Sequence, residues 1–147
     1  MILTIERAQQ LILINGLSVD HVTIANAVEY GHLDIVEMFL QNGANKDVTY
    51  GSSGTLVNVA VRHDIIEMTK LLIKYGTRID PPPILRFEIT MFTAFRNNNL
   101  DMMKVLIENN ASVNGKDSSG ETLLSNAIRT VLPTLKTVIL LNSCSLS

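Results

Sequence analysis

The side chains best suited to chemistry in this sequence are three histidines and one cysteine. His21, His32 and His63 form no H-x-x-x-H pair, and no C-x-x-C spacing offers a metal site. Cys144 lies near the C-terminus without a neighbouring base, and there is no G-x-S-x-G motif to supply a serine nucleophile. The sequence therefore predicts no catalysis, no cofactor and no bound metal.

The glycine-rich stretch GSSG, at 51–54, is the nearest approach to a phosphate-binding loop. It lacks the lysine of a P-loop, and no buried strand precedes it. We interpret it as the tip of a hairpin between structural elements.

Composition favours a folded, single-domain protein. The chain has 147 residues, 46% of them hydrophobic and 18% charged, with a net charge of −2. This charge gives no general attraction to nucleic acid or to an anionic membrane. One cysteine allows no intrachain disulfide, which favours a reducing compartment. We expect the cytoplasm, with the nucleus and the cytosol of a host cell as alternatives.

Two apolar stretches are candidates for targeting or membrane segments. MILTIERAQQLILING has Glu6 and Arg7 ahead of an apolar run of only four residues. VLPTLKTVILL spans 11 residues, about half of a membrane crossing. Neither stretch is expected to act as a signal peptide or to cross a membrane.

The elements that would position a functional surface come from an internal repeat. Ala27, Ala60, Ala94 and Ala127 follow one another at steps of 33, 34 and 33 residues. DIVEMFL at 34–40 aligns with EMTKLLI at 67–73, and LLI aligns with VLI at 105–107 and with VIL at 138–140. A sustained step of this length is typical of a stacked helical solenoid.

The repeated stretch GHLDIVEMFLQNGA resembles the second helix and exit turn of ankyrin repeats, and DSSGETLL at 117–124 resembles their hairpin tip and first helix. The family's T-P-L-H-x-A start is never complete; TLVNVA and TLLSNA are the nearest forms. The resemblance implies an all-α ankyrin-repeat solenoid with short or degenerate hairpin loops, forming a single domain over 1–147. Its copies would lie near 22–45, 50–80, 84–114 and 117–147, after an N-terminal capping half-repeat at 6–20. The sequence is also similar to ankyrin proteins of large DNA viruses and intracellular bacteria.

Local signals agree with this interpretation. Thr55 and Thr122 stand where a hydroxyl can accept a hydrogen bond from the first turn of a helix. Residues that tolerate a left-handed backbone follow each second helix and fill each turn between paired helices. These residues are Gly43, Gly76 and Asn110 after the helices, and Gly31, Asp64 and Asn98 in the turns.

Two places break the pattern. DPPPIL, at 80–85, cannot pair as an ordinary strand, and two interpretations remain: a stiff linker, or a ligand for a proline-binding domain. In the fourth copy, Val131 occupies the turn position, so the last helix must be entered differently. The apolar stretch around Leu135–Leu141 would then either face a further repeat of a longer array or contact another molecule.

The resemblance also implies a binding surface. Ankyrin repeats contact their partners through the hairpin tips and the two residues before the turn between paired helices. In this sequence those pairs are Glu29 and Tyr30, Arg62 and His63, Arg96 and Asn97, and Arg129 and Thr130.

Three of the six arginines thus occupy the same place in successive repeats. One interpretation is a column of guanidinium groups along a concave groove that binds an acidic segment of a partner protein. The other is a solvated helix end with no partner implied.

The sequence accordingly predicts a non-catalytic protein–protein interaction module, an adaptor or an inhibitor. The alternative is a spacer from a longer ankyrin array that self-associates through its apolar C-terminal helix. Nucleic-acid binding is not expected, because the pI is near 5.9. LIENNASVN, ending at Asn114, is similar to segments that asparagine hydroxylases modify, although a structural asparagine bonded across a hairpin is the favoured interpretation.

Overall fold

A computed structural model describes residues 6, 21–51, 54–82, 89–130 and 134–145. The expected capping half-repeat at 6–20 lies outside the described residues, apart from Glu6, and so does the second half of the proline-rich segment, 83–85. The helix pairs can be followed from His21 onward.

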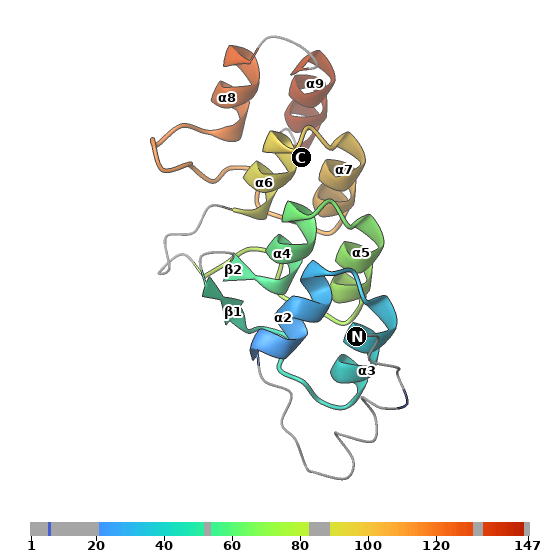
Figure 1. Ribbon diagram of the computed structural model, residues 1–147. Coiled ribbons are helices and arrows are strands. Elements are labelled where there is room, and N and C mark those ends of the chain that lie inside the picture. The colour runs from blue at the N-terminus through green and yellow to red at the C-terminus, as the bar shows by residue number, and fades with distance from the viewer. Residues whose placement is uncertain (1–5, 7–20, 52–53, 83–88, 131–133, 146–147) are drawn as a thin grey trace.

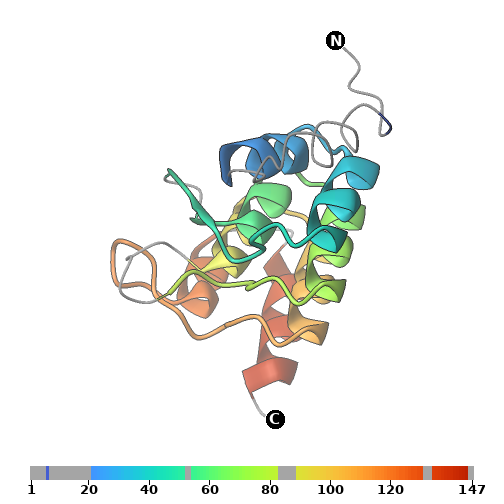
Figure 2. The same ribbon diagram turned by 90° about the horizontal axis from the view of Figure 1, so that it is seen from below.

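The described residues form helices in antiparallel pairs, each pair joined by a short turn. The first helices are α2 (His21–Glu29), α4 (Leu56–Arg62), α6 (Thr90–Arg96) and α8 (Leu123–Arg129). The second helices are α3 (Leu33–Gln41), α5 (Ile66–Lys74), α7 (Leu100–Glu108) and α9 (Thr134–Ser145). The two series form two parallel columns along the stack (Figures 1 and 2). This is the predicted all-α repeat solenoid.

Short extended segments connect one pair to the next. Strand β1 (Thr49–Tyr50) pairs antiparallel with β2 (Gly54–Thr55), so GSSG spans the end of a small hairpin as predicted. In the last copy a single bridge joins Lys116 to Thr122. Both connections project beside the column of first helices (Figure 1).

The start signals predicted from sequence are confirmed. Thr55 is the N-cap of α4, and its hydroxyl accepts a hydrogen bond from the Asn58 N–H at 3.1 Å. Thr122 does the same for α8 with the Ser125 N–H at 3.2 Å. Each hydroxyl satisfies one of the helix N–H groups that lack a partner within the helix.

The turn signals are confirmed as well. All six residues predicted to adopt a left-handed backbone have positive φ, from 55° at Asn98 to 83° at Gly43. They comprise Gly31, Asp64 and Asn98 in the turns within pairs, and Gly43, Gly76 and Asn110 after the second helices. The repeated glycine, aspartate and asparagine positions therefore fix where each helix stops.

The core runs through the middle of the stack between the two columns. In α4 every residue from Leu56 to Val61 is buried, because α4 packs against α2, α5 and α6. The second helices bury one face only; in α7 that face consists of Met102, Met103 and Leu106. Helix α4 is therefore an interior element, whereas the second helices present their other faces to solvent.

The fourth copy departs from the others, as Val131 suggested. Thr130 at the end of α8 is extended, with φ −81° and ψ 114°, whereas His63 and Asn97 at the matching positions are close to helical. Residues 131–133 lie outside the described part. The alignment of VIL with VLI does not extend to burial: Leu106 is fully buried, Ile139 at the aligned position is 62% exposed, and Leu141 is buried instead.

Candidate partner-binding edge

The residues expected to contact a partner lie along one edge of the stack, where the first helices end. We call this the first-helix edge, and define it as Glu29, Tyr30, Arg62, His63, Arg96, Asn97, Arg129 and Thr130. Each first helix ends at the first residue of a pair, and the second residue begins the turn. The backbone geometry therefore places these four pairs in equivalent positions along the column of first helices.

The N-terminal part of the edge carries an aromatic side chain and a pair of titratable groups. Tyr30 is 73% exposed, and its ring lies 6.4 Å from that of His32. The His63 imidazole lies 3.7 Å from a Glu29 carboxylate oxygen, across the packed helices α2 and α4. Glu29 places a negative charge at the position that arginine occupies in the later copies.

The middle of the edge combines exposed arginines with a bridging asparagine. Arg62 and Arg96 are exposed at the ends of α4 and α6. The Asn97 amide donates hydrogen bonds to the Val61 carbonyl at 3.0 Å and to an Asp64 carboxylate oxygen at 3.1 Å. Asn97 thus ties its own repeat to the turn of the preceding one, a structural role that the residue pattern did not reveal.

The C-terminal part of the edge includes an ion pair. The Arg129 guanidinium lies 2.8 Å from a carboxylate oxygen of Glu121, which precedes α8. The residue pattern does not single out Glu121; its place in the hairpin leading into α8 is the only signal that the sequence offers. A partner carboxylate would have to compete with Glu121 for Arg129.

A hairpin aspartate supports this region. The Asn126 amide donates a hydrogen bond to Asp117 at 2.9 Å, and the Glu121 N–H donates a second at 2.9 Å. These bonds, Asn126 first, together with the Ser119 N–H and the nearby Arg129 charge, hold the pKa of Asp117 below its ordinary value of 3.8. Asp117 therefore stays ionised and shapes the last hairpin.

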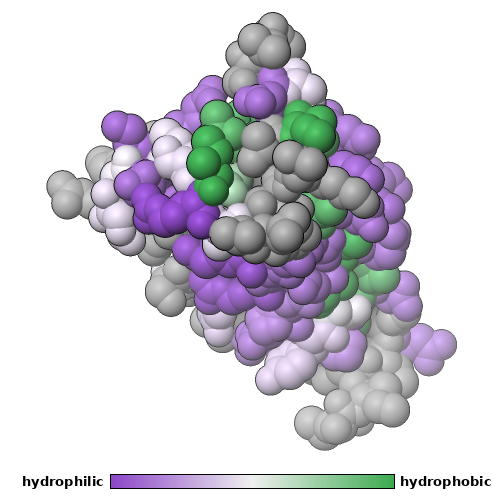
Figure 3. All heavy atoms as spheres, turned by 90° about the horizontal axis from the view of Figure 1, so that it is seen from above, coloured by the Kyte–Doolittle hydropathy of each residue, from purple (hydrophilic) through white to green (hydrophobic). Residues whose placement is uncertain are grey.

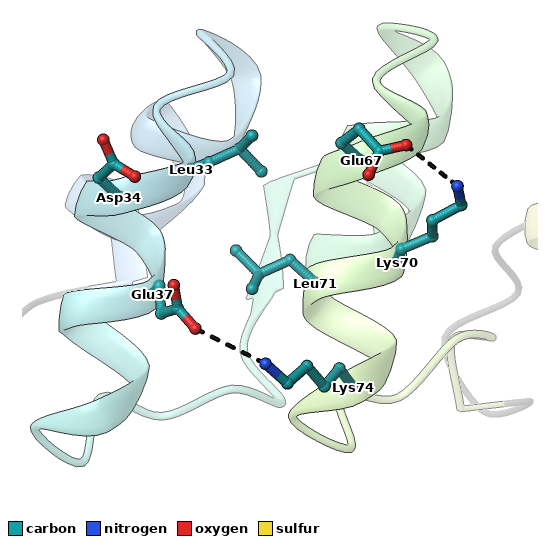
Figure 4. A pocket seen from close by; sticks show the side chains of 7 residues that line it. All are labelled: Leu33, Asp34, Glu37, Glu67, Lys70, Leu71 and Lys74. Carbon is teal, nitrogen blue, oxygen red and sulfur yellow. Dashed lines mark hydrogen bonds and ion pairs between the residues drawn. The ribbon is translucent and has the colours of Figure 1, made fainter.

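A hollow of about 380 Å³ lies on the other side of the stack, between α3 and α5. Leu33 and Leu71 point toward each other from the two helices (Figure 4). Two ion pairs lie beside them, Glu37 with Lys74 at 3.9 Å and Glu67 with Lys70 at 3.0 Å, and Asp34 adds a further carboxylate to the lining. The hollow is shallow and its charges largely offset one another, so it is a weaker candidate than the first-helix edge.

Neither a metal-binding cluster nor a membrane-spanning helix is found in the part of the chain that the structure describes. No cluster of three His, Cys, Asp or Glu side chains there could hold a metal ion. No helix among those residues is long and apolar enough to cross a bilayer.

The structure does not support the hypothesis that the Asn114 side chain is bonded across a hairpin. The residues at its place in the two earlier copies are Asp47 and Asp80, which accept hydrogen bonds from the Arg78 N–H and the Ser112 N–H in the following copies. Asn114 is exposed, and its side chain has no hydrogen-bond partner among the described residues. In the earlier copies, the N–H donor lies after the end of the second helix. At the matching place in the last copy the chain is still part of helix α9.

Stacked helix pairs with an exposed edge of helix ends define a helical-repeat protein, a class whose members offer an extended surface rather than an enclosed pocket. Comparison with known families finds the ankyrin repeat at residues 21–50. Residues 21–50 therefore form an ankyrin repeat, and the chain as a whole is similar to ankyrin-repeat proteins. Repeats of this kind generally bind other proteins, and as a rule they carry no catalytic activity.

Similar proteins agree on the family. Two fowlpox virus chains that carry the name ankyrin repeat protein are 34% identical over 89 residues and 29% identical over 127 residues. These matches cover 60% and 82% of this chain, but only 12% and 29% of the viral ones.

A glycerophosphocholine phosphodiesterase of Schizosaccharomyces pombe is 30% identical over 94 residues. That match covers 64% of this chain and 8% of the enzyme. The chain thus spans less than a third of the length of each of these relatives.

Proposed function

We propose that this chain binds an acidic segment of a partner protein along the first-helix edge. The observation that carries the proposal is that three successive first helices, α4, α6 and α8, each end in an exposed arginine. Guanidinium groups pair with carboxylates in a bidentate manner, so a column of them matches an extended acidic segment. The viral relatives support a host-cell protein as the partner.

The arginines would contribute more to encounter than to affinity. An exposed ion pair is worth about 0.2–1 kcal/mol, and salt screens it. Oriented charges mainly raise the association rate. Tyr30, which is 73% exposed, is the better anchor because aromatic side chains dominate binding energy at interfaces.

The competing interpretation assigns the arginines to the helix ends alone. A cation near a helix C-terminus interacts favourably with the helix dipole, by about 0.3–1 kcal/mol. This explanation requires no partner, so it predicts that the arginines affect stability but not capture of an acidic ligand.

The test uses a fluorescent deca-glutamate peptide as the probe. Its binding is compared between the natural chain, the variant Arg62→Gln, Arg96→Gln and Arg129→Gln, and a control with Lys70→Gln, Lys74→Gln and Lys104→Gln. Both variants lose three positive charges, but the lysines lie on the second helices. Fluorescence anisotropy at low salt measures binding, and far-UV circular dichroism checks the fold.

We expect the arginine variant to bind at least about tenfold more weakly and the lysine variant to bind nearly as well as the natural chain. Equal losses in both variants would mean that only net charge matters. Undiminished binding by the arginine variant would rule out the acidic-segment proposal.

The alternative hypothesis, a spacer of a longer array, uses a different surface. It assigns self-association to the apolar C-terminal helix α9, whereas the acidic-segment contacts are proposed for the ends of α4, α6 and α8.

A further inference from the structure

The hollow between α3 and α5 combines apolar and charged side chains in a small space. Along the side of the stack formed by the second helices, Figure 3 shows hydrophobic areas between hydrophilic ones. In the hollow, Leu33 and Leu71 supply the apolar surface, and Leu33 is 36% exposed. The volume of about 380 Å³ lies at the lower end of the range of about 300–1,000 Å³ that is usual for ligand pockets. The space therefore suits a single long side chain.

Helix α3 differs from the next two second helices in the charges of its first turns. In α5 the carboxylate of Glu67 lies 3.0 Å from Lys70, and in α7 the carboxylate of Asp101 lies 3.4 Å from Lys104. Each pair joins residues three positions apart, which are neighbours on a helix surface. By the same repeat steps, the lysine position of α3 is occupied by Glu37. The first copy thus lacks the basic residue that neutralises this part of the helix in the next two copies.

Asp34 and Glu37 are therefore like charges on neighbouring positions of α3. Such charges repel each other, and a cation that binds to both offsets the repulsion. Asp34 is exposed, and its side chain has no hydrogen bond or ion pair among the described residues. A cation at this place would find a carboxylate that no other described residue occupies.

Glu37 is held in position but keeps acceptor capacity. Its Oε1 atom accepts a hydrogen bond from the Tyr75 hydroxyl at 3.0 Å and lies 3.9 Å from the Lys74 ammonium group, near the limit for an ion pair. Its Oε2 atom has no hydrogen bond among the described residues. Figure 4 shows the Glu37 side chain pointing into the space between the two helices. Because Tyr75 orients the carboxylate, Glu37 is a preorganised acceptor for a donor in the hollow.

The lysines of the hollow leave this acidic place open. Lys70 lies on the side of α5 away from α3, where it pairs with Glu67 (Figure 4). Lys74 belongs to the last turn of α5, whereas Asp34 belongs to the first turn of α3, at the other end of the hollow. Three carboxylates and two ammonium groups line the hollow, which leaves one negative charge for a partner to neutralise.

A guanidinium group matches this arrangement. It presents five N–H donors in one plane, so it can donate to two carboxylates at once, whereas an ammonium group acts as a point charge. The methylene groups of an arginine lie along apolar surface while the charged end stays near water. In the hollow, the two leucines offer that apolar surface beside Asp34 and Glu37.

We propose that the hollow between α3 and α5 binds an arginine side chain of a partner protein, with its methylene groups between the two leucines and its guanidinium group at Asp34 and Glu37. The arginine takes the place that Lys70 and Lys104 occupy in the next two copies. None of the residues that line the hollow belongs to the first-helix edge, so the two surfaces can be tested separately.

The test is a titration followed by NMR of the leucine methyl groups, with Nα-acetylarginine amide as the probe. Nα-acetylcitrulline amide, in which a neutral urea group replaces the guanidinium group, is the control probe. The proteins are the natural chain, Asp34→Asn and the control Asp101→Asn. Both variants lose one carboxylate from the first turn of a second helix, but Asp101 does not line the hollow. Unchanged methyl signals of the buried Leu72 and Leu106 show that a variant is folded.

We expect the methyl signals of Leu33 and Leu71 to shift and to saturate with the arginine probe below about 100 mM. Asp34→Asn should bind this probe about two- to fivefold more weakly, which is the factor that one exposed charge pair contributes. Asp101→Asn should bind it as well as the natural chain does. The citrulline probe should bind the natural chain at least about fivefold more weakly than the arginine probe, because it loses both charge pairs.

Equal binding of the two probes to the natural chain would overturn the proposal, because the guanidinium charge would then contribute nothing. So would undiminished binding by Asp34→Asn, or an equal loss in Asp101→Asn, since net charge alone would then explain the effect. The absence of saturable shifts at the two leucines at the highest concentration of the arginine probe would overturn it as well.

Discussion

Asp80 shows how a single carboxylate can hold two repeats together. One of its oxygens accepts the Thr90 N–H at 2.9 Å, and the other accepts the Ser112 N–H at 2.7 Å. The first bond fixes the start of α6, and the second fixes the chain after α7. Asp47 has a related role in the preceding copy through the Arg78 N–H.

Replacing Asp80 with alanine should therefore be costly. Hydrogen bonds to a charged acceptor contribute about 1.5–3 kcal/mol each, and solvent can replace some of this because Asp80 is half-buried. We expect Asp80→Ala to lower the free energy of unfolding by about 2–4 kcal/mol in urea titrations. Asp101→Ala is the control; its exposed pair with Lys104 at 3.4 Å predicts a loss below about 1 kcal/mol. Equal losses would refute the bridging role.

Asp117 gives a prediction about pH. Because folding lowers the pKa of Asp117 from its ordinary value of 3.8, the ionised carboxylate stabilises the folded chain above that value. This contribution disappears as the pH falls through the lower pKa of the folded state. Thermal unfolding of the natural chain and of Asp117→Asn should therefore differ at pH 5–7, and the difference should shrink below about pH 4. A gap in melting temperature that does not change with pH would contradict this assignment.

At the scale of the elements, the repeat makes the same turn position available three times for comparison. Gly43 and Asn110 both follow a second helix, with φ of 83° and 63°. A Cβ added at Gly43 would meet no atom within 4 Å, so only backbone strain opposes a side chain there. Substitutions at these two positions therefore measure the cost of the left-handed turn with little interference from packing.

Gly43→Ala should destabilise the chain by about 1–2 kcal/mol, because a left-handed backbone is strained for alanine, whereas glycine adopts it freely. Asn110→Gly should change the free energy of unfolding by less than about 0.5 kcal/mol, since lower strain is offset by the greater entropy of the unfolded chain. Urea denaturation monitored by circular dichroism measures both. An Asn110→Gly loss as large as that of Gly43→Ala would show that the asparagine side chain has a further role.

The elements also show what the sequence could predict and what it could not. Thr55 and Gly43 act through their own backbone neighbourhood, so residue type alone indicated their roles. The repeat step could not predict which residues of α9 are buried, because that depends on the register of the helix. Three residues separate the helices in each of the first three pairs, but four separate α8 from α9. A fixed repeat step cannot account for that extra residue.

The first-helix edge, likewise, could be predicted from the sequence only in part. The repeat step predicted that Arg62, Arg96 and Arg129 would share one position at the ends of their helices, and this is where they lie. The ion pair of Arg129 with Glu121 and the bonds of Asn97 to the preceding turn depend on neighbours from other elements. Contacts of that kind follow from packing rather than from residue type, so they had no signature in the sequence.

At the scale of the whole molecule, the described helix pairs form a one-dimensional stack, an arrangement in which a pair packs mainly on its neighbours. Damage in the middle of such a stack removes contacts on two sides, whereas damage in the last pair removes contacts on one. Ala60 in α4 and Ala127 in α8 hold equivalent positions, and both are fully buried. The same substitution at these two residues therefore compares the interior of the stack with its end.

Ala60→Asp should unfold the stack, because an unpaired charge buried between α2, α4 and α6 costs more than the marginal stability of a domain can offset. Ala127→Asp should release α8 and α9 while α2 to α7 stay folded. Hydrogen exchange read by mass spectrometry distinguishes the two, with protection lost throughout in the first variant and only beyond about residue 115 in the second. Complete unfolding of both variants would mean that the last pair is required for the others to fold.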